Sequence, residues 1–296
     1  MATVQDLKRR IRSISNTRKL TRAMELVASA RLRRAQMRIE GMRPYADRMM
    51  ELMVGTARAS TSLQGLTLLQ RREVKRAAIV ALTGDRGLAG AFNAQVLRRA
   101  FALERQLRAD GIETRWLVAG KKGRSTLTFR RHEVEQAWIG FSDRPAYSDA
   151  QAIANRAIEL YEGGEVDRVV LVYNQFVSAL VQRVVESDVL PVPEHLLERG
   201  EEEERQAALL GDFIYEPEPE EILRRLLPVY VETELYRALL ESAASEQGAR
   251  MTAMRNASGN AADLISSLTL DMNRARQAEI TQEILEVVAG ADALTA

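Results

Sequence analysis

Two glycine-bearing turns are the segments of this sequence whose residue types could bind phosphate. Gly84–Gly90 (GDRGLAG) and Gly120–Ser125 (GKKGRS) each follow a short apolar run of strand length. A phosphate loop of the G-x-x-x-x-G-K-[ST] kind places a lysine against the γ-phosphate, and neither turn has that spacing. The G-x-G-x-x-G spacing of a dinucleotide loop is missing as well. Both segments therefore favour tight strand-to-helix turns over a catalytic nucleotide site.

Other catalytic or metal-binding constellations are also missing from the sequence. It contains no cysteine and only two histidines, His132 and His195, which lie far apart. Thiolate chemistry, a disulfide framework and a histidine metal cluster are thereby disfavoured. No G-x-S-x-G nucleophile elbow is present, and the acid pair Glu218 and Glu220 lies in a charged run typical of a solvated surface. We expect no catalytic residues, no metal and no cofactor, and a binding or mechanical protein.

Charge is abundant but balanced, at 28% charged residues and a net charge of +1. Residues 1–51 carry 13 Lys or Arg against five Asp or Glu, an excess of eight. No aromatic residue is interleaved with these cations before Tyr45, so base stacking is not offered and nucleic-acid binding is disfavoured. No run of about 18 apolar residues is present, and the amino terminus has no apolar signal core, so we expect no membrane span and no secretory signal.

The amino-terminal residues have the pattern of one long helix, assigned here to residues 1–58. Thr3 and Asp6 suit a helix start. An apolar stripe runs through Leu7, Ile11, Ile14, Met24, Val27, Ala30, Met49 and Met53. Gly41 and Pro44 could break or kink it. A helix of roughly 50 residues would be about 75 Å long.

A second long helix is assigned to residues 220–290, where the pattern is sharpest. Apolar residues recur in alternating steps of four and three, interrupted only by Gln247 and Ser258, which is the seam of a coiled coil. The seam consists of Leu240, Ala244, Gln247, Met251, Met254, Ser258, Ala261, Ile265, Leu268, Met272 and Ala275. We infer that the two terminal helices pair in an antiparallel coiled coil.

Between the helices, residues 75–195 are assigned to a small Rossmann-like α/β domain. Strands are predicted at 77–82, 116–119, 169–173 and 181–189, with helices at 92–109 and 150–161, and this alternation is typical of an α/β sheet. Residues 60–70 are interpreted as a polar linker. Residues 196–218 are interpreted as an acidic loop, a solvated surface segment or a short helix.

Segments along nearly the whole chain resemble gamma subunits of bacterial F-type ATP synthases. Each is weak alone, but their shared order is specific. They are Ile11–Ala28, Asp85–Leu88 with Phe92 and Asn93, Val172–Phe176, Tyr215–Pro217, Ala244–Gln247, Arg250–Met251, Met254–Ala257, Ala275–Gln277 and Ile280–Glu283.

The resemblance implies a non-catalytic central-stalk rotor that couples proton-driven rotation of the c-ring to ATP synthesis in the beta subunits and is required for F1 assembly. Its partners would be the hexameric ring of alpha and beta subunits, the epsilon subunit and the c-ring. The complex would place it peripherally on the cytoplasmic side of a bacterial plasma membrane, because the cysteine-bearing insertion of chloroplast relatives is absent.

The resemblance also assigns contact residues. Arg276 and Gln277 match a pair that meets a beta-subunit loop, with Thr281 and Glu283 shortly after. Met24 matches a position near the acidic lever loop of beta, for which Arg18, Lys19 and Arg22 would be basic partners. Phe213 and Tyr215 match the foot near the c-ring and epsilon. Ala89, Ala91 and Pro228 depart from the family pattern, and Pro228 puts a continuous helix at residues 227–229 in question.

Two other classes remain open from the residues alone. One is a freestanding α/β nucleotide-binding protein with coiled-coil arms, which would bind ATP or a dinucleotide. The other is a nucleic-acid-binding coiled-coil adaptor, whose affinity would fall steeply with salt.

Overall fold

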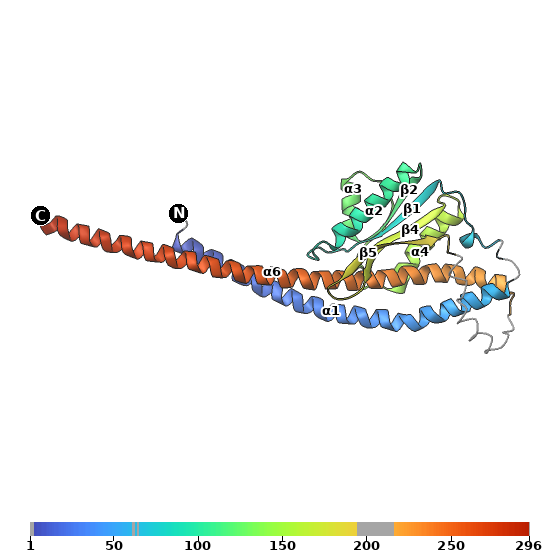
Figure 1. The fold of residues 1–296 in the computed structure, drawn as a ribbon, viewed down its shortest axis with the longest axis horizontal. Coiled ribbons are helices and arrows are strands. Elements are labelled where there is room, and N and C mark those ends of the chain that lie inside the picture. Colours follow the sequence, from blue (N-terminus) through green and yellow to red (C-terminus); the bar gives the residue numbers. More distant parts are fainter. Residues whose placement is uncertain (1–2, 61–62, 64, 194–215, 296) are drawn as a thin grey trace. The chain divides into compact units, whose positions relative to one another are not determined.

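The computed structural model describes residues 3–60, 63, 65–193 and 216–295, and only the backbone of 291–295 (Figure 1). The chain divides into two compact units, Met1–Ala28 with Arg250–Ala296, and Ser29–Ala249. The elements in order are α1 (Val4–Ala59), η1 (Thr67–Leu69), β1 (Arg76–Leu82), α2 (Phe92–Ala109), β2 (Glu113–Ala119), α3 (Lys121–Phe129), β3 (Val134–Trp138), α4 (Tyr147–Glu162), β4 (Arg168–Phe176), β5 (Gln182–Leu190) and α6 (Pro219–Thr295).

The larger unit is built on a mixed five-stranded sheet with strand order β3-β2-β1-β4-β5. The first four strands are parallel, and β5 returns antiparallel to β4 as a hairpin. Residues 77–82 of β1 are all buried, as expected for a central parallel strand covered on both faces. The Rossmann-like α/β fold expected from the sequence is confirmed.

Side chains of alternate strand residues enter two separate cores. Ile79 and Trp116 belong to the core under α2 and α3. Val80 and Leu117 belong to the opposite core, on the face of the sheet that α4 covers (Figure 1). This core also contains buried residues of both α1 and α6, such as Met53 and Leu227. The helical stretches 29–59 and 219–249 are therefore part of the α/β unit, whereas the sequence pattern assigned them to separate segments.

Both prolines in the terminal helices lie inside continuous helix. Pro44 is within α1 and Pro228 is within α6, so neither ends its helix as the sequence allowed. A proline removes one backbone hydrogen bond. At Pro228 the flanking Leu227 and Val231 are almost completely buried. Their packing holds the helical path through residues 227–229.

In the smaller unit the predicted seam of α6 is the face turned inward. Met251, Met254 and Ala261 are buried. The other seam residues of this unit are half-buried: Ser258, Ile265, Leu268, Met272 and Ala275. Residues 276–290 are all exposed. The 4-3 spacing therefore identified the buried face correctly over this stretch.

The predicted stripe of α1 is wrong between residues 21 and 30. Val27 is 52% exposed and Ala30 is exposed, while Thr21, Glu25 and Ala28 are buried. Glu25 can occupy the inner face because its carboxylate accepts hydrogen bonds from Arg22 (2.7 Å) and Arg255 (3.1 Å). A charged residue therefore takes the inward position that hydrophobicity assigned to apolar residues, because its carboxylate is paired there.

Three short elements escaped the sequence interpretation: η1, α3 and β3. Residues 60–70 are not a purely polar linker, because Leu66, Leu68 and Leu69 are buried in the core on the α4 side of the sheet. The acidic stretch 194–215 lies outside the described residues.

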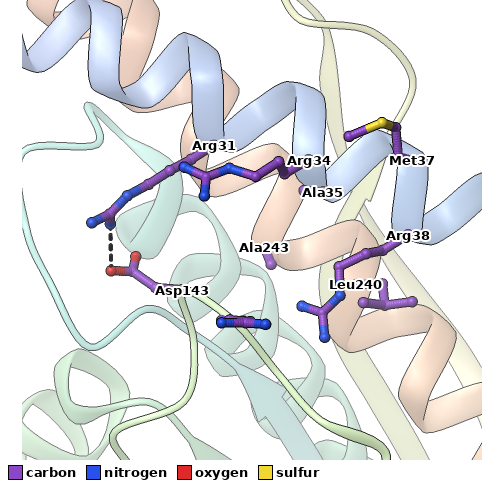
Figure 2. A pocket seen from close by; sticks show the side chains of 9 residues that line it. Arg31, Arg34, Ala35, Met37, Arg38, Asp143, Leu240 and Ala243 are labelled. Atoms are coloured by element: carbon purple, nitrogen blue, oxygen red, sulfur yellow. Dashed lines mark hydrogen bonds and ion pairs between the residues drawn. The ribbon is translucent and has the colours of Figure 1, made fainter.

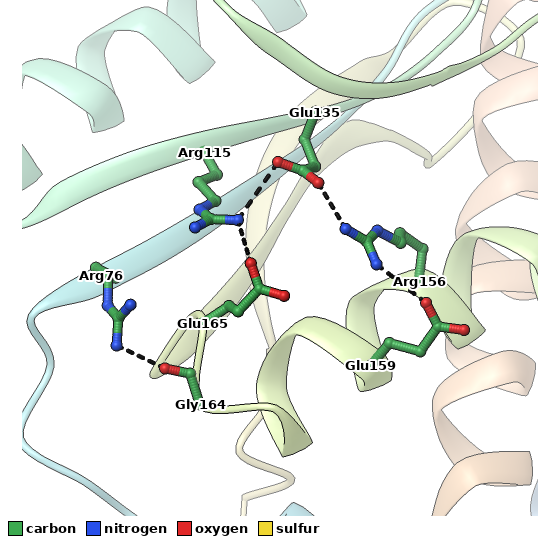
Figure 3. A network of polar contacts seen from close by, with 7 residues as sticks. All are labelled: Arg76, Arg115, Glu135, Arg156, Glu159, Gly164 and Glu165. Atoms are coloured by element: carbon green, nitrogen blue, oxygen red, sulfur yellow. Dashed lines mark hydrogen bonds and ion pairs between the residues drawn. The ribbon is translucent and has the colours of Figure 1, made fainter.

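Polar contacts join surface loops and edges to this framework. Arg31 of α1 pairs with Asp143, in the loop before α4, at 2.8 Å (Figure 2). On another side, Glu135 of β3 pairs with Arg115 of β2 (3.4 Å) and Arg156 of α4 (2.6 Å), which ties the short edge strand β3 to its neighbours (Figure 3).

Candidate functional site

The crevice where this kind of sheet normally binds ligands lies between the carboxyl ends of β1 and β4. The chain order reverses there, and open α/β sheets hold their ligands at such switch points. In this chain α6 fills the position. The Ser245 hydroxyl, fully buried, donates to the Asn174 carbonyl at the end of β4 (3.1 Å). A Cβ at Gly84, just after β1, would lie 2.8 Å from the Glu246 carboxylate. The crevice therefore contains protein where a nucleotide-binding enzyme would hold its ligand.

The Asp85 side chain ties three loops together at this edge. Its carboxylate accepts backbone N–H bonds from Lys121 (2.9 Å), Gly140 (2.9 Å) and Ser142 (3.0 Å). Partial burial opposes ionisation of Asp85, but these bonds outweigh it and hold the pKa of the carboxyl below its ordinary value. A carboxylate satisfied in this way is a structural acceptor and not a general base.

We expect Asp85→Asn to lower the free energy of unfolding by about 1–2 kcal/mol at neutral pH, because an amide replaces an ionised acceptor of three bonds and the site is half-exposed. Since folding lowers the pKa of Asp85, its contribution is present above about pH 4 and is lost as pH falls through the folded value. Urea unfolding of the wild type and of Asp85→Asn should be measured from pH 7 to pH 3. The difference between their free energies of unfolding should shrink below about pH 4. A difference that stays constant over this range would contradict the ionic role.

The glycines of the second turn serve close packing of the ends of β1 and β2. Gly120 has φ +100°, and a Cβ there would collide with the Thr83 carbonyl. A Cβ on Gly123 would lie 2.6 Å from Thr83 Oγ1, which accepts the Gly123 N–H at 2.9 Å. The tight strand-to-helix turns expected from the sequence are thus present, and the N–H groups of Gly84, Lys121 and Gly123 donate to protein side chains.

Buried polar side chains attach α6 to the α/β domain. The Tyr147 hydroxyl of α4 donates to Glu232 (2.6 Å), and burial together with this carboxylate raises the pKa of Tyr147 well above its ordinary value. Further along, the Gln247 amide donates to Asp143 (3.1 Å). These contacts, with Ser245, were missed by sequence reasoning. Polar residues on a helix give no signal of a partner so distant along the chain.

The residues expected to meet a beta subunit lie at the surface of the smaller unit. Arg276, Gln277, Thr281 and Glu283 are all exposed on α6. The Thr281 hydroxyl donates to the Gln277 carbonyl one turn earlier (2.9 Å), so its proton is already used within the helix.

The basic group on α1 is less uniform than its sequence suggests. Arg18 and Lys19 are exposed and Met24 is half-buried. Arg22 is exposed as well, but it pairs with Glu25, whose pKa is held below its ordinary value by the bonds from Arg255 and Arg22. The positive charge of Arg22 is therefore partly neutralised by a carboxylate of its own helix. The spacing of Arg22 and Glu25 on one helix could have indicated that pair; the Arg255 contact could not have been found from spacing.

Phe213 and Tyr215 lie outside the described residues. Within the described ranges no group of three or more His, Asp or Glu is placed to hold a metal ion. Likewise, no helix in that part of the chain is long and apolar enough to cross a membrane.

Comparisons with known proteins match the whole chain. The family model described as ATP synthase covers residues 3–294. The chain is 46% identical to an ATP synthase gamma chain of Rubrobacter xylanophilus over 296 residues, covering all of both sequences, and 45% identical to one of Moorella thermoacetica over 294 residues, covering 99% and 100%.

Among solved structures, the chain is similar to chains of mitochondrial ATP synthases. The central stalk and c-ring structure of Tetrahymena thermophila mitochondrial ATP synthase contains a chain with 26% identity and a TM-score of 0.58, aligned over 81% of this chain and 99% of that one. A chain of the Euglena gracilis mitochondrial ATP synthase shares the fold, with a TM-score of 0.67, 17% identity, and coverage of 98% and 94%.

Proposed function

This chain belongs to the ATP synthase gamma-chain family, and we propose that it is the central-stalk rotor of a bacterial F-type ATP synthase. The observation that carries the proposal is the filled switch point. α6 passes through the position where an α/β enzyme would hold a ligand, and Ser245 and Glu246 are buried there. The α/β domain is thereby mounted on a long helix, which suits the transmission of torque.

The subunit forms no bonds with substrate and acts by biasing conformations in its partners. Rotation of the c-ring turns the stalk, and each orientation stabilises one conformation of a beta subunit over another. A shift from a minor to a dominant state requires about 5 kcal/mol of differential binding, supplied by the many contacts of the shaft. The partners are the alpha and beta subunits, the epsilon subunit and the c-ring.

As part of a membrane-bound complex, the chain associates with the membrane through its partners, and we place it peripherally on the cytoplasmic side. Contact with beta is assigned to Arg276, Gln277 and Thr281 on α6 and to Arg18, Lys19, Arg22 and Met24 on α1. Contact with the c-ring and epsilon is assigned to Phe213 and Tyr215.

Single-molecule rotation tests the rotor role directly. The chain is assembled with cognate alpha and beta subunits on a surface, and a bead is attached to the α/β domain. We expect ATP to drive continuous rotation in one direction. A complex that hydrolyses ATP while the bead stays stationary would rule out a shaft.

Arg276→Ala tests the assigned contact on α6. A charge-assisted hydrogen bond contributes roughly 1.5–3 kcal/mol, so its loss should weaken binding to the alpha–beta ring about tenfold or more and lower the torque of the assembled motor. Arg274→Ala is the matched control, because it removes an exposed cation two residues away on the same helix. Equal behaviour of the two variants in assembly and torque would show that Arg276 has no specific contact.

A further inference from the structure

A cavity of about 600 Å³ lies between α1, α6 and the loop that precedes α4 (Figure 2). Arg31, Arg34 and Arg38 line it from one face of α1, at the i, i+3, i+7 spacing of successive helical turns. The loop contributes Asp143 and Arg144. All of these residues belong to the Ser29–Ala249 unit.

The positive charge of this arginine cavity is only partly neutralised. Asp143 is its single lining carboxylate. It already pairs with Arg31 at 2.8 Å and with Arg86 at 3.3 Å. Four lining arginines against one aspartate leave an excess of three positive charges.

The other three lining arginines are Arg34, Arg38 and Arg144, and none of them pairs with a described carboxylate. Arg38 donates to the Pro145 carbonyl (3.0 Å), and Arg34 donates to the Ala30 carbonyl of its own helix (3.4 Å). Among the side chains that the structure describes (residues 3–60, 63, 65–193 and 216–290), no carboxylate forms an ion pair with Arg34, Arg38 or Arg144. Their planar donor groups remain available for an anion with several oxygens.

We propose that the arginine cavity binds a small anion carrying two or more phosphoryl groups. Arginine stays charged at any physiological pH, and its forked donors match phosphate oxygens in pairs. Apolar atoms of Leu240 and Ala243 form the α6 side, and a partly dry wall strengthens such bonds. The volume is within the usual range of small-molecule sites, roughly 300–1,000 Å³.

A compact ligand suits this shape better than a protein segment. Three elements line the space, so a ligand can be contacted from several sides at once. An extended acidic peptide would instead follow the exposed arginines along one side of α1. The proposed site is separate from the sheet's own crevice, which α6 fills, and it does not depend on the rotor role.

Isothermal titration of pyrophosphate into the full chain, without divalent cations, tests the proposal. We expect saturable binding at one site. Arg34→Gln and Arg144→Gln should each weaken it about tenfold or more, since each removes a charge-assisted contact. Arg34→Lys keeps the charge but loses the fork, and should fall between the wild type and Arg34→Gln.

Arg33→Gln is the matched control, because Arg33 is an exposed cation of α1 that does not line the cavity. We expect it to change the affinity less than twofold. Equal weakening by Arg33→Gln and Arg34→Gln would mean diffuse charge attraction and would overturn the site, as would no binding by the wild type. Tighter binding of a hexaglutamate peptide than of pyrophosphate would overturn it in favour of a protein segment. Thermal melts of each variant confirm that the chain is folded, and bead rotation is scored separately.

Discussion

Replacing Gly120 by alanine is expected to lower the free energy of unfolding of the α/β unit by about 3 kcal/mol or more. Two costs combine at this position. Gly120 has φ +100°, a conformation that costs other residues on the order of 1–3 kcal/mol. The added Cβ would also collide with the Thr83 carbonyl. That carbonyl belongs to backbone and cannot rotate away, so the ends of β1 and β2 must separate, at a further cost of about 1–3 kcal/mol.

Gly111→Ala separates these two costs. Gly111 also has a positive φ, +78°, but a Cβ there would meet nothing within 4 Å. Its substitution should therefore show backbone strain alone, about 1 kcal/mol. Chemical denaturation followed by the fluorescence of the two tryptophans, Trp116 and Trp138, measures both variants. If Gly120→Ala were no more destabilising than Gly111→Ala, the close approach of the two strand ends would not be a determinant of stability.

The periodicity of α6 predicted its inward face but not what that face contacts. Beyond residue 250 burial follows the seam, with Met251, Met254 and Ala261 buried and the residues between them half-buried or exposed. Residues 241–248 are buried all round, including Glu241 and Glu246. The same seam spacing fits a helix that packs against one other helix and a helix that packs against a sheet. The sequence therefore predicted a two-helix coiled coil where α6 also closes the α/β core.

For α1, apolar spacing failed where polar residues face inward. Leu20, Leu26 and Val27 are more than half exposed, while Thr21 and Glu25 are buried. Hydrophobicity predicts burial only when the partner face is apolar, and here the partner offers Arg255. A long-range ion pair of this kind has no local signature. Exposed leucines on the same stretch are, by contrast, consistent with a shaft that meets other subunits.

The candidate site could be predicted as turns but not as a filled crevice. Glycine spacing at residues 84–90 and 120–125 was sufficient to disfavour a phosphate loop, because loop chemistry is local. The bonds of Ser245 to Asn174 and of Gln247 to Asp143 join residues far apart in sequence. No periodic pattern in the sequence predicts rotation, which was suggested by the family resemblance alone.

Met53→Ala should show how strongly α1 is held in the α/β unit. Met53 is fully buried in the core that also contains Leu223 and Leu227 of α6 and residues of the sheet. Truncation of a buried methionine costs about 2–5 kcal/mol through lost burial and the cavity that remains. We expect about 3 kcal/mol in equilibrium urea unfolding, with no change in the slope against urea concentration.

The neighbouring residue provides the control. Leu52 is 60% exposed on the same turn of α1, so Leu52→Ala should change the free energy of unfolding by less than about 0.5 kcal/mol. A shaft that carries torque must keep both helices attached to the domain that the c-ring turns. In the rotation assay under load, Met53→Ala should therefore slip more often than Leu52→Ala. If the two variants were equally stable and slipped equally often, the core around Met53 would not be what couples α1 to the domain.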